Sequence, residues 1–208
     1  SHGRERKGAD SVYAIRGAGG LASSPWPMFR RTVRHTAYDW HPVGGGVEPG
    51  QAIFSMAVGA SGTLYVGGTF TTAGGLSASG VASWNGTAWS ALGAGLSDGY
   101  ASGLSRLGNS LYVGGLVQQA GFTDGPNLGH WNGSWNTLYG PNGPVYAVAV
   151  APNGDVFVGG EFTAAPSVYV NNVLRIAPGG GYFPLGSSPN DGVNGPVRAI
   201  AIDQNGRG

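Results

Sequence analysis

The stretch Leu64-Tyr65-Val66-Gly67-Gly68 occurs three times in this chain with only small changes. It returns as Leu111-Tyr112-Val113-Gly114-Gly115 and as Val156-Phe157-Val158-Gly159-Gly160. Equivalent glycines are 47 residues apart from Gly67 to Gly114 and 45 apart from Gly114 to Gly159. A period of this length is typical of repeat architectures. β-Branched and aromatic residues followed by paired glycines predict a strand that ends at a positive φ or a close backbone approach.

Each copy also contains further segments with strand patterns. An alternating strand precedes the paired glycines at residues 52–58, 101–107 and 145–151, and another is expected at 197–202. A tight hairpin follows in two copies, with Asn85-Gly86 between Trp84 and Trp89, and with Asn132-Gly133 between Trp131 and Trp135. Asn-Gly between two aromatic-bearing strands favours a type I′ turn.

The repeat predicts an all-β fold, because it holds four strands a copy and no helical periodicity. We expect an incomplete β-propeller of about three four-stranded blades plus the first strand of a fourth. The blades are placed at residues 47–99, 100–143 and 144–195, with the next beginning at 196–208. Residues 1–46 are expected to be an extended linker or the tail of a preceding propeller.

Composition excludes several classes of protein. The chain has no cysteine, which excludes a disulfide framework and thiolate metal sites. No apolar stretch approaches the ~18 residues of a membrane helix, so we expect no membrane insertion. Seven of the eleven basic residues lie within residues 1–40, yet they are scattered and lack a stacking platform, so we expect no nucleic acid partner.

Two parts of the chain resemble known families. Residues 64–70 and 81–96 are similar to repeats of large secreted bacterial surface proteins and of the fungal cortical polarity marker family, which share the kelch and galactose-oxidase-like propeller layout. Residues 11–16 and 24–36 resemble the closing segment of propellers with pyrroloquinoline-quinone-type repeats. The resemblance implies a seam between two propellers, in a longer protein that is extracellular or at the cell surface.

Both resembled groups include enzymes, but the chain lacks their catalytic residues. A galactose-oxidase-like copper centre needs a Cys–Tyr cross-link and a histidine pair, whereas the four histidines here do not pair across blades. The quinone-type segment is a tail, and tails do not carry the cofactor site. We therefore expect no enzyme activity, no catalytic residue, no cofactor and no bound metal. His35 and His41 are better explained by a solvated linker, and Asp124–Asn127 by a turn.

The repeated tryptophans allow two interpretations. Trp84, Trp89, Trp131 and Trp135 could line sugar-binding pockets between blades, or they could be the packing that joins adjacent blades, which strand periodicity favours. With them, the structural repeat positions are the glycines Gly67, Gly68, Gly114, Gly115, Gly159 and Gly160. The sequence assigns no ligand-binding residue.

The function expected from these patterns is a noncatalytic extracellular binding or scaffold module, whose propeller loops contact protein or carbohydrate. Two alternatives remain: a carbohydrate-binding, lectin-like propeller, and a purely structural repeat that self-assembles. The expected strands at 11–16 and 197–202 have no partner in the repeat. Because an unpaired strand edge is a template for another chain, we expect self-association, as a closed dimer or an open filament.

Overall fold

The computed structural model describes residues 43–59, 61–120, 123–124, 126–136, 138–186 and 191–203. Over these residues all regular structure is β, and there is no helix, as the sequence predicts. The described part accordingly contains no helix long and apolar enough to cross a membrane. The predictions for residues 1–42, including the strand at 11–16 and the His35–His41 pair, lie outside the described residues.

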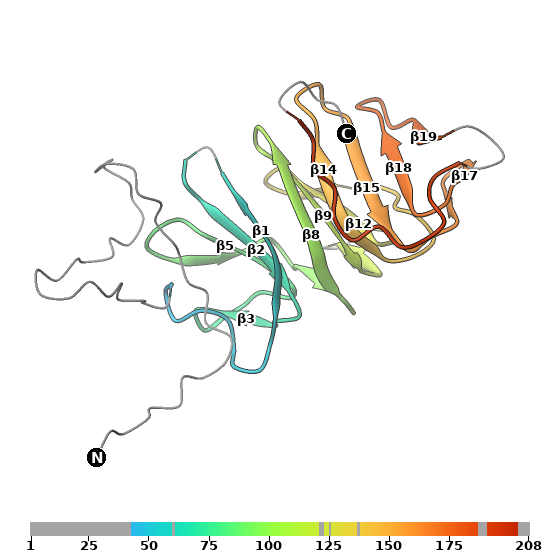
Figure 1. Cartoon of the computed structure of the whole chain (residues 1–208). Coiled ribbons are helices and arrows are strands. Elements are labelled where there is room, and N and C mark those ends of the chain that lie inside the picture. The colour runs from blue at the N-terminus through green and yellow to red at the C-terminus, as the bar shows by residue number, and fades with distance from the viewer. Residues whose placement is uncertain are drawn as a thin grey trace, which may run out of the picture.

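Three antiparallel sheets of four strands each follow one another along the chain and stand side by side (Figure 1). In each sheet the strands occur in sequence order. The first sheet consists of β1 (Ile53–Val58), β2 (Leu64–Gly68), β5 (Val81–Trp84) and β6 (Trp89–Ala91). The second consists of β8 (Tyr100–Leu107), β9 (Ser110–Leu116), β12 (Leu128–Trp131) and β13 (Trp135–Asn136). The third consists of β14 (Val145–Val150), β15 (Val156–Gly160), β18 (Val173–Ile176) and β19 (Tyr182–Pro184).

Short strands occupy the segment between the second and third strands of every sheet. They form a two-stranded hairpin in the first and third copies. In the second copy they form a three-stranded sheet, whose third strand comes from the segment before the four-stranded sheet. They are β3 (Thr72–Ala73) with β4 (Leu76–Ser77), β7 (Leu96–Ser97) with β10 (Gln119–Ala120) and β11 (Thr123–Asp124), and β16 (Ala164–Ala165) with β17 (Val168–Tyr169).

The first glycine of each pair lets neighbouring sheets approach. A Cβ on Gly67 would stand 2.8 Å from the Cβ of Ala101 and 3.3 Å from Leu104, both on β8. On Gly114 it would overlap Val145 and lie 2.7 Å from Val148, on β14. None of these glycines has a positive φ. Close approach, rather than the left-handed region, therefore explains why glycine stands here.

The second glycine of each pair allows a close backbone contact within its own sheet. A Cβ on Gly68 would overlap the carbonyl oxygen of Ala52, and the same holds for Gly115 with Tyr100 and Gly160 with Pro144. The register shifts at this point, between Ile53 and Ser55 in the first sheet and at the equivalent place in the other two. A β-bulge in each first strand thus sits against the paired glycines.

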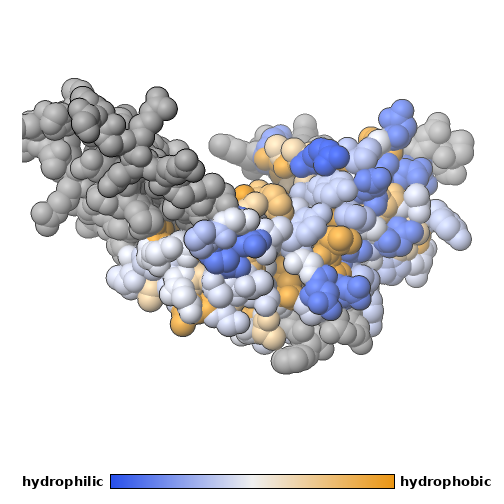
Figure 2. All heavy atoms as spheres, turned by 90° about the horizontal axis from the view of Figure 1, so that it is seen from below, coloured by the Kyte–Doolittle hydropathy of each residue, from blue (hydrophilic) through white to orange (hydrophobic). Residues whose placement is uncertain are grey.

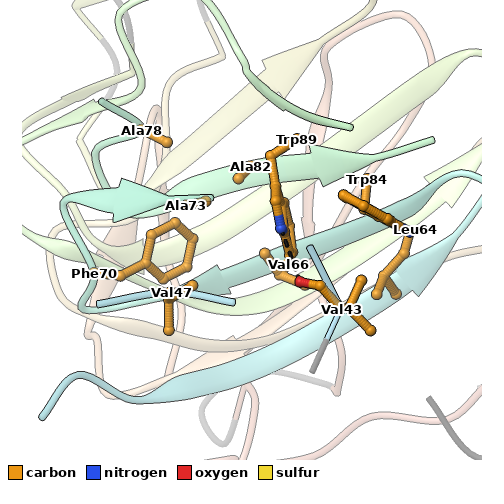
Figure 3. Close-up of a cluster of buried hydrophobic side chains, with 10 residues drawn as sticks. All are labelled: Val43, Val47, Leu64, Val66, Phe70, Ala73, Ala78, Ala82, Trp84 and Trp89. Carbon is orange, nitrogen blue, oxygen red and sulfur yellow. Dashed lines mark hydrogen bonds between the residues drawn. The ribbon is translucent and has the colours of Figure 1, made fainter. Parts of the chain in front are cut away.

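The hydrophobic core lies between the sheets. One cluster joins Val81 and Leu92 of the first copy to Leu104 and Val113 of the second, and another joins Leu128 to Val145 and its sheet. A third cluster covers the outer face of the first sheet, where Val43 and Val47 pack on Val66 and Trp89 (Figure 3). Each sheet is therefore stabilised by its neighbour, as repeat units generally are.

Residues 43–46, which we assigned to the linker, pack against the first sheet. Val43 is 1% exposed, and its carbonyl accepts a hydrogen bond from Trp89 Nε1 at 3.0 Å (Figure 3). Trp135 Nε1 donates to Leu92 in the same way, at 2.7 Å. The stretch Val43–Val47 is thus the counterpart of Leu92–Leu96.

The strand expected at Val197–Ile202, as the first of a fourth blade, does not form, and that prediction was wrong. The backbone N–H of Val197 donates to Gly160 O at 2.9 Å, and its side chain lies 2.5 Å from where a Cβ on Gly159 would stand. The segment occupies on the third sheet the place that β14 occupies on the second. It is not a strand because no second strand is hydrogen-bonded beside it within the described residues.

The Asn-Gly hairpins form, but their turns are not type I′. A type I′ turn needs two central residues with positive φ, and here only Gly86 (100°) and Gly133 (111°) have it. The loops between paired tryptophans are residues 85–88 and 132–134, which is longer than the two residues of that turn. In the first loop Asn85 Oδ1 instead accepts hydrogen bonds from the N–H groups of Thr87 and Ala88.

Candidate binding face

The repeated tryptophans are packing residues in this structure. Trp84 and Trp89 are each 5% exposed, and their rings meet at 5.5 Å. Trp131 and Trp135 are half-buried and pack against the cluster between the first and second sheets, with ring centroids 5.4 Å apart. In both copies the second tryptophan donates its Nε1 hydrogen to the preceding segment. The exposed inter-blade aromatics of the lectin alternative are not at these positions.

One end of the three sheets carries the segments that differ most between copies. These segments connect the second strand to the third, and we call their described residues, within 69–80, 116–127 and 161–172, the variable loops. In Figure 1 this end lies at the bottom of the first sheet, where β3 is labelled. Figure 2 looks onto it from below and shows separate hydrophobic patches among hydrophilic residues. We take this end as the candidate binding face.

Each variable loop is closed at its base by a residue in the left-handed region. The positions are equivalent: Gly80 (φ 69°), Asn127 (64°) and Asn172 (64°). Asn172 Oδ1 accepts the N–H of Phe162 at 3.2 Å, and its Nδ2 donates to Val193 O at 2.9 Å. Asn127 makes the same two kinds of bond, to Val117 N and Pro141 O. Asparagine tolerates this φ and ties the loop to the next segment.

A polar side chain from the preceding segment holds the other side of the loop. Glu48 accepts hydrogen bonds from the backbone N–H and hydroxyl of both Thr71 and Thr72, at 2.6–2.9 Å for three of them. Asn142 Oδ1 accepts the N–H groups of Thr163 and Ala164 at 3.0 and 3.1 Å. Partial burial raises the pKa of the Glu48 carboxyl, but the four donors outweigh it and hold the pKa at about 2. The first and third loops are therefore braced by the chain itself.

An aromatic row crosses this end at the start of the first strands. Phe54 of β1 is 52% exposed, and its ring meets that of Tyr100 of β8 edge-on, with centroids 5.5 Å apart. Tyr146 of β14 donates its hydroxyl to Glu161 Oε2 at 3.1 Å. The Arg198 guanidinium lies over the Tyr146 ring, 5.0 Å from its centroid. Burial first, and then Glu161 and Tyr100, raise the pKa of Tyr146, so its hydroxyl stays protonated at neutral pH.

Two other titratable side chains, His130 and Asp155, have structural partners. His130 stacks on Tyr112 at 4.7 Å, and its Nε2 lies 3.0 Å from Ser110 Oγ. Burial lowers the pKa of His130, which favours the neutral form of the ring. Asp155 is ion-paired with Arg175 at 3.0 Å, at the end opposite the variable loops. In the described part of the chain no three His, Asp or Glu side chains are grouped so that they could hold a metal ion.

No protein-family model and no curated protein matches this chain.

The repeat glycines and tryptophans could be named from the sequence, whereas the residues of the candidate binding face were not. A signal was available for the loop bases, since Gly80, Asn127 and Asn172 each stand directly before the third strand. Phe54 and Tyr146 share another signal: each follows the residue paired with the second glycine, at the bulge. Neither could be given a role from spacing alone, because Phe54 contacts Tyr100 and Tyr146 contacts Arg198, which lie about one repeat away in the sequence.

Proposed function

We propose that this chain is a noncatalytic binding module of an extracellular or cell-surface protein, and that its three sheets are blades of an incomplete β-propeller. In this proposal residues 197–202 lie where the first strand of a further blade would pack, although they do not form a strand here. Support comes from the recurrent contact of a first strand with the preceding glycine: Leu104 on Gly67, Val148 on Gly114 and Ile200 on Gly159. A constant step of this kind from one sheet to the next generates a radial array.

The main support for a binding role is that hydrogen bonds from asparagine and glutamate side chains hold the variable loops in place. Their bases are fixed by the left-handed Asn127 and Asn172, and the sides of two of them by Glu48 and Asn142. Loops held in one conformation lose little entropy when they meet a partner. Their exposed residues differ between copies, from Leu76 (49% exposed) to Tyr169 (87%). A constant frame that presents different side chains is typical of a recognition surface.

The test compares the two ends of the sheets. The chain is labelled and applied to an array printed with glycans and with purified extracellular proteins. A loop-end variant combines Phe54→Ser, Leu76→Ser and Tyr169→Ser, and the control is Leu107→Ser, which changes an exposed apolar residue (38%) at the opposite end. We expect binding that the loop-end variant loses and the control keeps. Failure to bind any probe, or equal binding by both variants, contradicts the proposal.

A specific observation favours the self-assembling alternative as a second candidate. Met56 of β1 has the same register as Leu104 and Val148, which are 8% exposed, yet Met56 is 55% exposed because no glycine-bearing sheet among the described residues faces it. A second copy could cover this face. Light scattering at micromolar concentration tests it: a dimer or larger species that Met56→Lys abolishes supports assembly, and a stable 21.0 kDa monomer contradicts it.

A further inference from the structure

The aromatic row of Phe54, Tyr100 and Tyr146 has no role in the core of the molecule. All three hydrophobic clusters form without these rings, although their neighbours Ile53 and Val145 take part in them. Phe54 also differs from Met56 on the same strand, because its ring contacts the second sheet rather than the open face. The row is therefore an aromatic surface that packing between the sheets does not require.

The bulge explains how these side chains come to lie at the end of the sheets. Phe54 and Tyr146 are the extra residues in the register shifts between Ile53 and Ser55 and between Val145 and Ala147. A bulged residue is released from the alternation of the strand and can be turned toward the rim. In the second sheet this position is Ser102, whose hydroxyl donates to Val145 O at 2.5 Å, and Tyr100 supplies the ring instead.

The rings are held in place before any ligand arrives. Phe54 and Tyr100 meet at an interplanar angle of 69°, and Tyr146 is fixed by Glu161 at its hydroxyl and by Arg198 over its ring. Each sheet contributes one ring, so the row runs across the sheets rather than along one strand. Glu161 and Arg198 are exposed and carry opposite charges beside it. The surface thus combines fixed apolar rings with hydrogen-bonding groups of no net charge.

We propose that this row is a binding track for a linear, uncharged oligosaccharide or polysaccharide. The proposal rests on the proposed binding function and names its ligand class. Sugar rings offer C–H faces that pack on aromatic rings and hydroxyl groups that exchange hydrogen bonds with a carboxylate, a guanidinium and a phenol. A row with one ring per sheet suits a chain of similar sugars. A protein partner would instead need a continuous interface of roughly 800 Å² on this chain, wider than a single row of rings.

The experiment uses affinity electrophoresis of the full chain in gels that contain soluble glucomannan, xyloglucan or hydroxyethyl cellulose. Titration calorimetry with cellohexaose and mannohexaose then gives the dissociation constant. We expect at least one of these probes to bind. Phe54→Ala and Tyr146→Ala should each weaken binding about tenfold or more, while Tyr146→Phe, which keeps the ring, should weaken it less. Thermal melts check that each variant is folded.

Two control variants separate this proposal from the broader one. Leu107→Ala, at the opposite end of the sheets, and Met56→Ala, on the open face of β1, are these controls, and neither should affect sugar binding. Tyr169→Ala, which removes the most exposed described aromatic of the loops, tests the broader proposal. Binding of a sugar or protein that depends on Tyr169 and not on Tyr146 would contradict the sugar-binding role of the aromatic row but not the proposed binding function of the chain. No binding to any sugar overturns the track. The proposal is also overturned if Tyr146→Ala abolishes the binding of a protein and leaves sugar binding unchanged, because the row would then contact a protein.

Discussion

β1 and β8 have the same register and opposite surroundings. Leu104 of β8 is 8% exposed because it packs against Gly67 of the first sheet, whereas Met56, at the equivalent position of β1, is 55% exposed. Val58, two residues on, is 58% exposed. The pattern of the two strands is alike, so the difference comes from what stands in front of them. Whether a side chain is buried therefore depends on the sheet that packs against it and not on the pattern of its own strand.

The segment Val43–Val47 makes this comparison sharper. It covers the outer part of the first sheet just as Leu92–Leu96 covers the outer part of the second. The inner part, at Met56, has no such cover among the described residues. The first sheet is therefore packed like the second at its outer strands and exposed at its inner strand, and the following predictions test that division.

The largest effect is expected from filling the space at a junction. Gly114→Val should destabilise the chain by at least about 3 kcal/mol, the upper end for overpacking, because its side chain would overlap Val145 and Val148. Urea unfolding followed by tryptophan fluorescence measures it. Gly179→Val is the matched control, since no atom lies within 4 Å of a Cβ there and its φ is not positive. Equal stability of the two variants would show that the sheets are not in contact at Gly114.

The two equivalent first-strand residues should respond differently to truncation. Leu104→Ala should cost about 2–3 kcal/mol, since it leaves a cavity between sheets. Met56→Ala should stay within about 0.5 kcal/mol, as for other exposed positions. Chemical unfolding at two protein concentrations measures both. If Met56→Ala costs as much as Leu104→Ala, the face of β1 is covered in solution and the comparison fails.

A smaller effect is expected where the outer strands are covered. Trp89→Phe removes the hydrogen bond from Nε1 to Val43 O and should cost about 1 kcal/mol. Trp135→Phe removes the equivalent bond to Leu92 O and should cost a similar amount. Matching values from thermal or urea unfolding would show that Val43–Val47 holds the first sheet as firmly as Leu92–Leu96 holds the second. A negligible loss for Trp89→Phe alone would contradict this.

The smallest effect concerns Glu48, whose place is taken by the neutral Asn142 in the third copy. The four donors lower the pKa of Glu48 from 4.5 to about 2 in the folded chain. Its stabilising contribution is therefore complete above about pH 4.5 and is lost as the pH falls through about 2. Glu48→Gln should be less stable than the parent at pH 7, and the difference should vanish near pH 2. A difference independent of pH would show that the charge is not involved.

Local pattern predicted much of the fold. The second strands, the hairpins at Asn85 and Asn132 and the all-β class follow from residue types that neighbour one another in sequence. The candidate binding face did not follow, because Phe54 and Tyr100 or Asn172 and Val193 meet only once the sheets are side by side. The turn type failed for a related reason: the register of the tryptophan pairs, and not the Asn-Gly dipeptide, determines the length of the loop.

The sequence by itself determined the repeat, the four strands of each copy and the places where no side chain fits. Those properties depend on the alternation of residues and on glycine, which act within a few residues of each other. Only the tertiary structure decided which neighbour each glycine admits, which aromatic rings are left at the rim, and why Leu104 is buried and Met56 is not. These depend on contacts between residues about one repeat apart, and such contacts exist only after one sheet has packed against the next.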